Sequence, residues 1–108
     1  MAYESVLVAL ADPTRRQVFE ELRGGAKSVG AIAERLPVSR PAVSQHLKVL
    51  RDAGLVADRA DGTRRVYYID PHGLGPLRAW LDEFWDQALA AFREEAEATA
   101  PRRRKTRR

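Results

Sequence analysis

Apolar residues recur at helical spacing through the first part of the chain. Residues 3–10 form a short apolar segment with this periodicity. A second helix is expected from Asp12 and Pro13, because an aspartate N-cap followed by proline in the first turn is a helix-start signal. The pair Gly24 and Gly25 ends it. Its apolar stripe consists of Val18, Phe19 and Leu22.

Two further short helices follow, joined by a tight turn. Ser28 is expected to cap a helix over 28–36, and Ser39 to cap a helix over 39–53 that a glycine closes. Pro41 is tolerated there, because the first turn of a helix needs no amide donors. The residues that these two helices turn inward are Ile32, Ala33, Leu36, Val43, Leu47 and Leu50.

The pattern then changes to that of strands. Two strand-like segments, 55–60 and 63–69, flank the dipeptide Asp61-Gly62. Such a dipeptide between two strand-like segments predicts a β-hairpin, because glycine adopts a positive φ at little cost. Two helices joined by a turn and followed by a hairpin are the order of a winged helix-turn-helix, with 55–69 as the wing.

A long final helix is expected over 71–97, started by Asp70 and Pro71. At about 1.5 Å per residue it would be roughly 40 Å long. A domain of this size has a radius of gyration of only about 13 Å and cannot cover such a helix. An ordinary core helix with frayed ends is one interpretation; we favour a helix that pairs with a second copy of the chain. Its apolar residues are Leu74, Leu77, Trp80, Leu81, Phe84, Trp85, Ala88, Leu89 and Phe92.

The predicted fold class is therefore mainly α with a β-hairpin wing (α+β), in the order α-α-α-α-β-β-α, and dimeric. Residues 1–97 are expected to form this single domain. The remaining residues, 98–108, are expected to be a basic, disordered tail.

The exposed face of the helix over 39–53 carries groups suited to DNA. On a helical wheel Pro41, Gln45, Lys48 and Asp52 lie opposite the apolar side, with Arg40 and Ser44 on the flank. Glutamine can bond adenine through two hydrogen bonds, serine can bond any base, and the cations can reach guanine or phosphate. A solvated polar face is the plainer interpretation. The hairpin favours DNA, because its arginines can reach phosphates or the minor groove. The wing residues concerned are Thr63, Arg64 and Arg65.

Charge is distributed unevenly along the 108 residues, whose net charge is +4. Segment 102–108 has six basic residues and no acid, so the rest of the chain carries −2. Residues 35–65 carry +4 and residues 70–97 carry −5. The basic middle therefore coincides with the predicted recognition helix and wing, which indicates an anionic partner there.

Several classes are disfavoured by absent features. The chain has no cysteine, which excludes disulfides and thiolate metal sites. It has no apolar run of membrane-spanning length and no signal-like start, so a cytoplasmic location is expected. No P-loop, GxGxxG or GxSxG pattern occurs, so we expect no enzyme and no cofactor. A winged helix that binds an acidic protein instead of DNA stays open.

The stretch SVGAIAERLPVSRPAVSQHLKVLRDAGLVADRADGTRRVYYI resembles the ArsR/SmtB family of bacterial winged-helix repressors. The segment VSQHLKVLRDAGLV with its D-G-T-R-R wing carries most of the resemblance, and the preceding ALADPTRRQVFEEL is similar as well. The resemblance covers about residues 5–90. It implies a homodimer that represses transcription by occupying a double-stranded operator, with the first and last helices as its interface.

This resemblance also implies roles for individual residues. The interface would comprise Val6, Leu10, Leu77, Leu81, Phe84, Trp85, Ala88 and Phe92. The DNA-binding residues would be Ser39, Arg40, Pro41, Ser44, Gln45, His46, Lys48, Thr63, Arg64 and Arg65. For His46, which lies at the margin of the buried face, a structural role is an equal alternative.

Many members of this family sense metals through two kinds of site. The thiolate motif aligns with Ser28, Gly30 and Ala31, none of which is a soft ligand. A second site on the final helix has a weak counterpart in Asp70, His72, Glu83 and Asp86, with glutamate where the family has a second histidine. The alternative is that Asp70 caps the helix and the other carboxylates are solvated. We therefore expect a metal-independent member; whether a small-molecule effector exists stays open.

Overall fold

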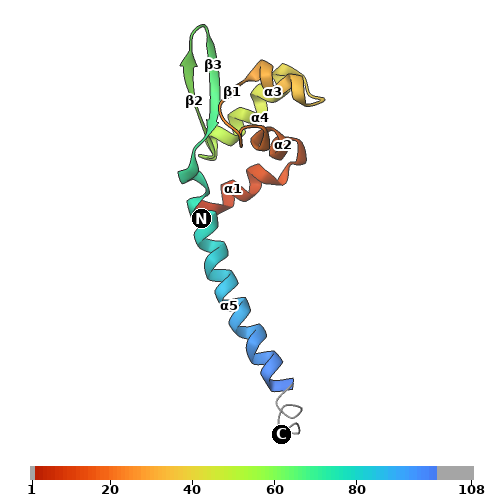
Figure 1. Cartoon of the computed structure of the whole chain (residues 1–108), viewed down its shortest axis with the longest axis vertical. Coiled ribbons are helices and arrows are strands. Elements are labelled where there is room, and N and C mark those ends of the chain that lie inside the picture. Colours follow the sequence, from red (N-terminus) through yellow and green to blue (C-terminus); the bar gives the residue numbers. More distant parts are fainter. Residues whose placement is uncertain (1, 100–108) are drawn as a thin grey trace. The chain divides into compact units, whose positions relative to one another are not determined.

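The computed structural model describes residues 2–99 (Figure 1). They divide into an N-terminal unit, residues 2–77, and a C-terminal unit, residues 78–99. The elements in chain order are α1 (Ala2–Ala11), α2 (Pro13–Glu21), β1 (Lys27–Ser28), α3 (Val29–Arg35), α4 (Arg40–Asp52), β2 (Val56–Asp61), β3 (Arg64–Ile69), the 3-10 helix η1 (Pro71–Leu74) and α5 (Gly75–Thr99). This is a winged helix-turn-helix, as the sequence predicts.

Three helices start where the sequence places a capping side chain. The Asp12 carboxylate accepts the backbone N–H groups of Thr14 and Arg15 at 2.9 and 3.0 Å. Ser28 Oγ accepts the N–H of the third residue after it at 3.2 Å, and Ser39 Oγ does the same at 3.3 Å. Each cap satisfies amide donors that have no partner inside their helix. The predicted starts of α2, α3 and α4 are confirmed.

The hairpin is confirmed, but its turn lies one residue further along than predicted. Asp61 is the last residue of β2 and pairs with Arg64, so the two-residue turn is Gly62-Thr63 rather than Asp61-Gly62. Gly62 has a φ of 66°, as a turn with a positive φ at its first central position requires. Thr63 therefore lies in the turn itself.

A third strand was not predicted. β1 pairs antiparallel with β3, with Lys27 opposite Tyr67 and Ser28 opposite Val66, and the strand order is β1-β3-β2. Two residues are too few to show an alternating pattern in a sequence. β1 connects the wing to the start of α3, which positions the wing beside the helix-turn-helix.

The N-terminal unit is built around an apolar core. The predicted inward residues of α4, namely Val43, Leu47 and Leu50, are each 0% exposed, as is Ile32 of α3. They pack with Val18 of α2, with its C-cap residue Leu22 and with Leu55 before β2, which holds α4 with one fixed side toward the core. At about 25 cal/mol per Å² of apolar surface, this burial is the main force that stabilises the unit.

The predicted interface on α1 is partly wrong. Val6 is only 1% exposed and belongs to the core of its own unit, so it has no surface left for a partner. Leu10 is half-buried against the same core. The apolar side chains that α1 exposes are Leu7, at 43%, and Val8, at 68%.

The long final helix begins later and ends later than predicted. Asp70 Oδ1 accepts the N–H of His72 at 3.0 Å and caps the 3-10 turn η1, after which α5 starts at Gly75. α5 continues to Thr99, so residues 98 and 99 are helical and not part of a disordered tail. The other tail residues, 100–108, lie outside the described residues. None of the helices within residues 2–99 is long and apolar enough to span a membrane.

The C-terminal unit has no core of its own. No residue of α5 is buried, and Leu81, Phe84, Trp85 and Phe92 are 48%, 58%, 66% and 70% exposed. Trp80 and Phe84 stack with ring centroids 5.5 Å apart and an interplanar angle of 12°. A single helix cannot cover such a stripe by itself.

Candidate nucleic-acid interface

α3, its turn and α4 present one polar surface away from the core. Because Val43, Leu47 and Leu50 anchor α4 on one side, its opposite side is exposed. The predicted contact residues on that exposed side are Arg40, Pro41, Ser44, Gln45 and Lys48. Their amide, hydroxyl and cationic groups are the kinds of groups that bond base edges and phosphates in a major groove.

Two of the predicted contact residues at α4 and its cap already have side-chain partners in the protein. Ser39 Oγ is occupied as the N-cap of α4, although Ser39 itself is exposed. Lys48 Nζ lies 3.3 Å from Asp52 Oδ2, with both side chains more than half exposed. An exposed pair of this kind contributes little to stability, so Lys48 can exchange its carboxylate for a phosphate.

His46 lies apart from the exposed face of α4. It is half-buried, and its charge is among the influences that hold the pKa of the Asp12 carboxyl below its ordinary value. The largest of those influences is the hydrogen bond from the backbone N–H of Arg15, and the bond from Thr14 and the Arg15 guanidinium add to it. This position beside the start of α2 favours the structural alternative for His46.

The two adjacent arginines of the wing, Arg64 and Arg65, differ in their ion-pair partners. Arg65 Nη1 lies 2.9 Å from Asp58 Oδ2, and Arg51 Nη1 from the end of α4 lies 3.5 Å from the other oxygen of the same carboxylate. Asp58 is only 17% exposed and so ties the wing to α4. Arg64, one position earlier, has no carboxylate partner within residues 2–99.

Asp58 and Arg51 were not singled out from the sequence. The hairpin register contained the signal for Asp58, which lies opposite Tyr67 and therefore diagonal to Arg65 on the same face. The contact with Arg51 depends on how α4 packs against the sheet. Arg59, also on β2, covers the ring of Tyr68 at 5.9 Å from its centroid and is the second wing cation with a partner.

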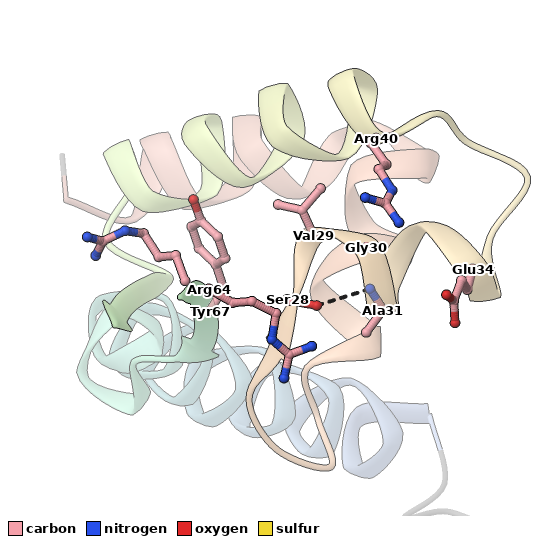
Figure 2. Close-up of a pocket in the computed structure, with 9 residues that line it drawn as sticks. Ser28, Val29, Gly30, Ala31, Glu34, Arg40, Arg64 and Tyr67 are labelled. Carbon is pink, nitrogen blue, oxygen red and sulfur yellow. Dashed lines mark hydrogen bonds between the residues drawn. The ribbon is translucent and has the colours of Figure 1, made fainter. Parts of the chain in front are cut away.

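An open pocket of about 440 Å³ lies where α3, α4 and the wing meet (Figure 2). α3 and the cap before it contribute Ser28, Gly30 and Glu34. Arg40 comes from the first residue of α4, and its guanidinium lies over Gly30. The wing supplies Arg64, Arg65 and Tyr67. The helix-turn-helix and the wing therefore share one basic pocket.

The residues that align with the two family metal sites lie in different surroundings. The positions that align with the thiolate motif lie in the basic pocket, where the Arg40 guanidinium over Gly30 disfavours a metal cation. His72 Nδ1 lies 3.3 Å from Asp70 Oδ1, and the His72 side chain is 96% exposed. Within residues 2–99 no group of three or more histidine, cysteine or acidic side chains comes together as a metal site.

A winged helix-turn-helix with a polar second helix and a basic wing defines a DNA-binding protein. A family profile described as a helix-turn-helix domain matches residues 10–59. The chain is 61% identical over 84 residues to the HTH-type transcriptional regulator Rv2034 of Mycobacterium tuberculosis, and the match covers 78% of each protein. It is 39% identical over 80 residues to the transcriptional repressor SdpR of Bacillus subtilis, covering 74% of this chain and 89% of SdpR.

A solved structure of a winged helix-turn-helix domain is also similar to this chain. The homodimeric winged helix-turn-helix DNA-binding domain of Mb0332 from Mycobacterium bovis, described as a possible ArsR-family transcriptional regulator, is similar at a TM-score of 0.64 and 32% identity. The match covers 82% of each chain. The chain belongs to the ArsR/SmtB family of winged helix-turn-helix transcriptional regulators, which are DNA-binding proteins and not enzymes.

Proposed function

We propose that the protein is a homodimeric repressor that binds a quasi-palindromic operator and works without a metal. The observation that carries the proposal is the two-sided character of α4, with three residues at 0% exposure on one side and a polar, exposed side opposite. An α-helix in this setting fits the major groove. Because the target is chromosomal DNA, the protein would act in the cytoplasm.

Within this proposal the exposed residues of α4 have two roles, contacts to base edges and contacts to phosphates. Gln45 and Ser44 would bond base edges, whereas Lys48 and Arg40 would bond phosphates or guanine. In the wing, Arg64 would contact the DNA backbone. Arg65 would chiefly position the wing through Asp58, since its guanidinium is already engaged.

The proposed dimer uses the exposed apolar residues of α5. Leu81, Phe84, Trp85, Ala88 and Phe92 are all exposed, and the similar Mb0332 domain is homodimeric. Leu77 and Leu10, half-buried against the core, would contribute at the edge. Two-fold pairing would place two copies of α4 about one helical turn apart, roughly 34 Å, which predicts a palindromic operator.

The experiment that tests the proposal is selection of duplexes from a random library by the purified full-length protein. A palindromic consensus is the expected result. With that operator in hand, Gln45→Ala should lose about 1–3 kcal/mol of discrimination against single-base variants of the site. Equal losses on operator and random DNA would show that Gln45 positions the protein without reading a base. Specific duplex binding by no library member, together with capture of an acidic protein, would overturn the proposal.

Metal independence and the basic tail need tests of their own. Excess zinc, nickel or cobalt should leave the melting temperature and the operator affinity unchanged. A metal ion that bound the native state would instead raise the melting temperature. Deleting 102–108 should lower non-specific affinity and its salt dependence but keep the operator preference. A metal-dependent shift in the melting temperature or the operator affinity would contradict metal independence. Loss of the operator preference on deleting 102–108 would contradict the role proposed for the tail.

A further inference from the structure

Asp58 of β2 lies where the wing passes the end of α4. In the turn after the helix, the Gly54 N–H donates to the Arg51 carbonyl and the Leu55 N–H to the Leu50 carbonyl, each at 2.9 Å. Gly54 has a φ of 82°, which allows the chain to reverse its direction there. β2 therefore begins next to the helix that the chain has just left.

The inner and outer parts of the wing are held differently. Val56 and Val66 are 3% and 5% exposed, and β1 pairs with β3 at Val66 and Tyr67. The outer part, residues 59–65, is a two-stranded ribbon with its turn, and every residue in it is exposed (Figure 1). Two strands without a packed face are marginally stable by themselves. The direction of this ribbon therefore depends on contacts where burial ends, and Asp58 is the last half-buried residue of β2 before that point.

Two arginines from different elements bind the two oxygens of the Asp58 carboxylate. Arg65 Nη1 of β3 lies 2.9 Å from Oδ2, and Arg51 Nη1 of α4 lies 3.5 Å from Oδ1. The Asp58 side chain is 17% exposed, whereas those of Arg65 and Arg51 are 57% and 45% exposed. Among the described residues 58–65, Asp58 is the one that forms an ion pair with another element. Its carboxylate therefore joins α4, β2 and β3 at one point.

The same carboxylate also lies between two like charges. The guanidinium groups of Arg51 and Arg65 would repel each other if the charge of Asp58 were removed. One of them belongs to α4 and the other to the wing, so this repulsion would drive the wing away from α4. Ion pairs of exposed arginines contribute little to stability. The main consequence of losing Asp58 is therefore expected in the geometry of the wing.

We propose that Asp58 is a positioning residue for operator recognition, which holds the wing at the angle to α4 that lets both bind one duplex. This inference rests on the proposed function. On the operator, α4 must meet base edges while the wing meets the backbone, so an error in the angle costs one set of contacts. On random DNA the binding is mainly electrostatic and needs no fixed register. Asp58 thus favours the operator although DNA repels its charge.

Asp58→Asn in the full-length protein separates geometry from charge, because the two predict opposite changes. The substitution raises the net charge of +4 by one unit, so electrostatics alone would tighten binding to every duplex. A misplaced wing should instead lower the affinity for the selected operator by about five- to tenfold, with binding to a random-sequence duplex unchanged or tighter. An operator affinity that rose in parallel with the random-duplex affinity would overturn the inference.

Asp61→Asn is the matched control on the same strand. Asp61 is exposed at the end of β2, opposite Arg64, and forms no ion pair with α4 in the described part of the chain. Its substitution removes the same charge from the wing but leaves the contact between Asp58 and Arg51 intact. The operator preference should be that of the wild type. An equal loss of preference in Asp61→Asn would show that the contact with α4 has no special role.

The ratio of the two affinities distinguishes positioning from a merely structural role. A loss of folded protein lowers the binding of operator and random duplex by the same factor and leaves their ratio unchanged. The expected result for Asp58→Asn is a lower ratio, measured well below the melting temperature of the variant. An unchanged ratio together with a lower melting temperature would mean that Asp58 only stabilises the fold, and would overturn the positioning role.

Arg51→Gln tests the partner of Asp58 on α4. It removes the same contact from the other side, so the operator preference should again fall. The double variant Arg51→Gln/Asp58→Asn should lose no more preference than Asp58→Asn alone, because both substitutions break one contact. Additive losses would contradict an action of Asp58 through Arg51.

Amide hydrogen exchange of the free protein measures the wing directly. Exchange in residues 59–65 should become about fivefold faster in Asp58→Asn, whereas exchange in the buried part of α4 should be unchanged. Unchanged exchange in the wing would contradict the inference. Absence of any preferred duplex for the wild type would refute the proposed function itself, whereas wild-type preference that Asp58→Asn retains in full would refute this inference alone.

Discussion

The N-terminal unit and α5 use the same hydrophobic spacing to opposite effect. In residues 2–77 the apolar stripes of α2, α3 and α4 converge, and Ile32, Leu47 and Leu50 are 0% exposed. In residues 78–99 the stripe stays open, with Trp85 66% and Phe92 70% exposed. Full burial of a side chain such as Phe92 is worth about 1.5–3 kcal/mol, and most of that surface is still exposed here. A period of 3.6 residues thus shows that a helix has an apolar side, but not which chain covers it.

The largest expected effect is on the assembly. The double variant Leu81→Asp/Phe84→Asp places two charges in the stripe of α5 and should abolish the dimer, because an unpaired charge is very costly to bury. The N-terminal unit should stay folded, since neither residue belongs to its core. Sedimentation measures the mass, and circular dichroism measures the helix content. A folded, unchanged dimer would refute the proposed interface.

The next effect concerns the core of the N-terminal unit. Leu47→Ala should cost about 2–5 kcal/mol of unfolding free energy, because the deletion leaves a cavity in a packed core. Phe92→Ala is the matched comparison on the exposed stripe of α5. In the monomeric Leu81→Asp/Phe84→Asp background, Phe92→Ala should change denaturant stability hardly at all. Comparable losses for both substitutions would show that the two regions do not differ as described.

A smaller effect is expected from a close approach of two backbone segments. A Cβ added to Gly73 in η1 would collide with the carbonyl of Gly54 at the end of α4. The atoms that the new Cβ would meet belong to the backbone, so the clash can be relieved only by moving the chain. Gly73→Ala should therefore cost about 1–3 kcal/mol of unfolding free energy. Gly75→Ala is the control, as a Cβ there meets nothing within 4 Å. Thermal unfolding of both variants measures the difference, and equal melting temperatures would contradict it.

The smallest effect is a pH dependence at the start of α2. Hydrogen bonds from the Arg15 and Thr14 N–H groups, with nearby positive charge, lower the pKa of Asp12 from its ordinary 3.8. A lowered pKa in the folded state means that ionised Asp12 stabilises the fold above 3.8. This stabilisation is lost as the pH falls through that value toward the folded pKa. Asp12→Asn should therefore flatten the acid limb of stability against pH, and an identical acid limb would disprove the contribution.

Much of the N-terminal unit could be predicted because its signals are local. Asp12, Ser28 and Ser39 act on amides two or three residues away, so their capping roles follow from the sequence alone. Val43, Leu47 and Leu50 share one face of any helix that contains them. The hairpin follows from its glycine, with an error of one residue in the turn.

The larger differences from the sequence predictions depended on neighbours distant in the sequence. Val6 was taken for an interface residue and lies in the core, because only the packing of α1 decides which of its apolar positions are covered. β1 was missed because two residues form a strand only where β3 lies beside them. The contact of Asp58 with Arg51, and that of Arg40 with Gly30, likewise join separate elements.

By itself the sequence determined the helix starts, the hairpin, the buried side of α4 and the family, because each depends on residues within a few positions or on a continuous motif. The tertiary structure decided which charges are available to a ligand. Arg64 and Arg65 are adjacent and equivalent in the sequence, yet only Arg65 is held by a carboxylate. The physical reason is that the interaction of two charges depends on their distance in space and on their solvation, and folding sets both.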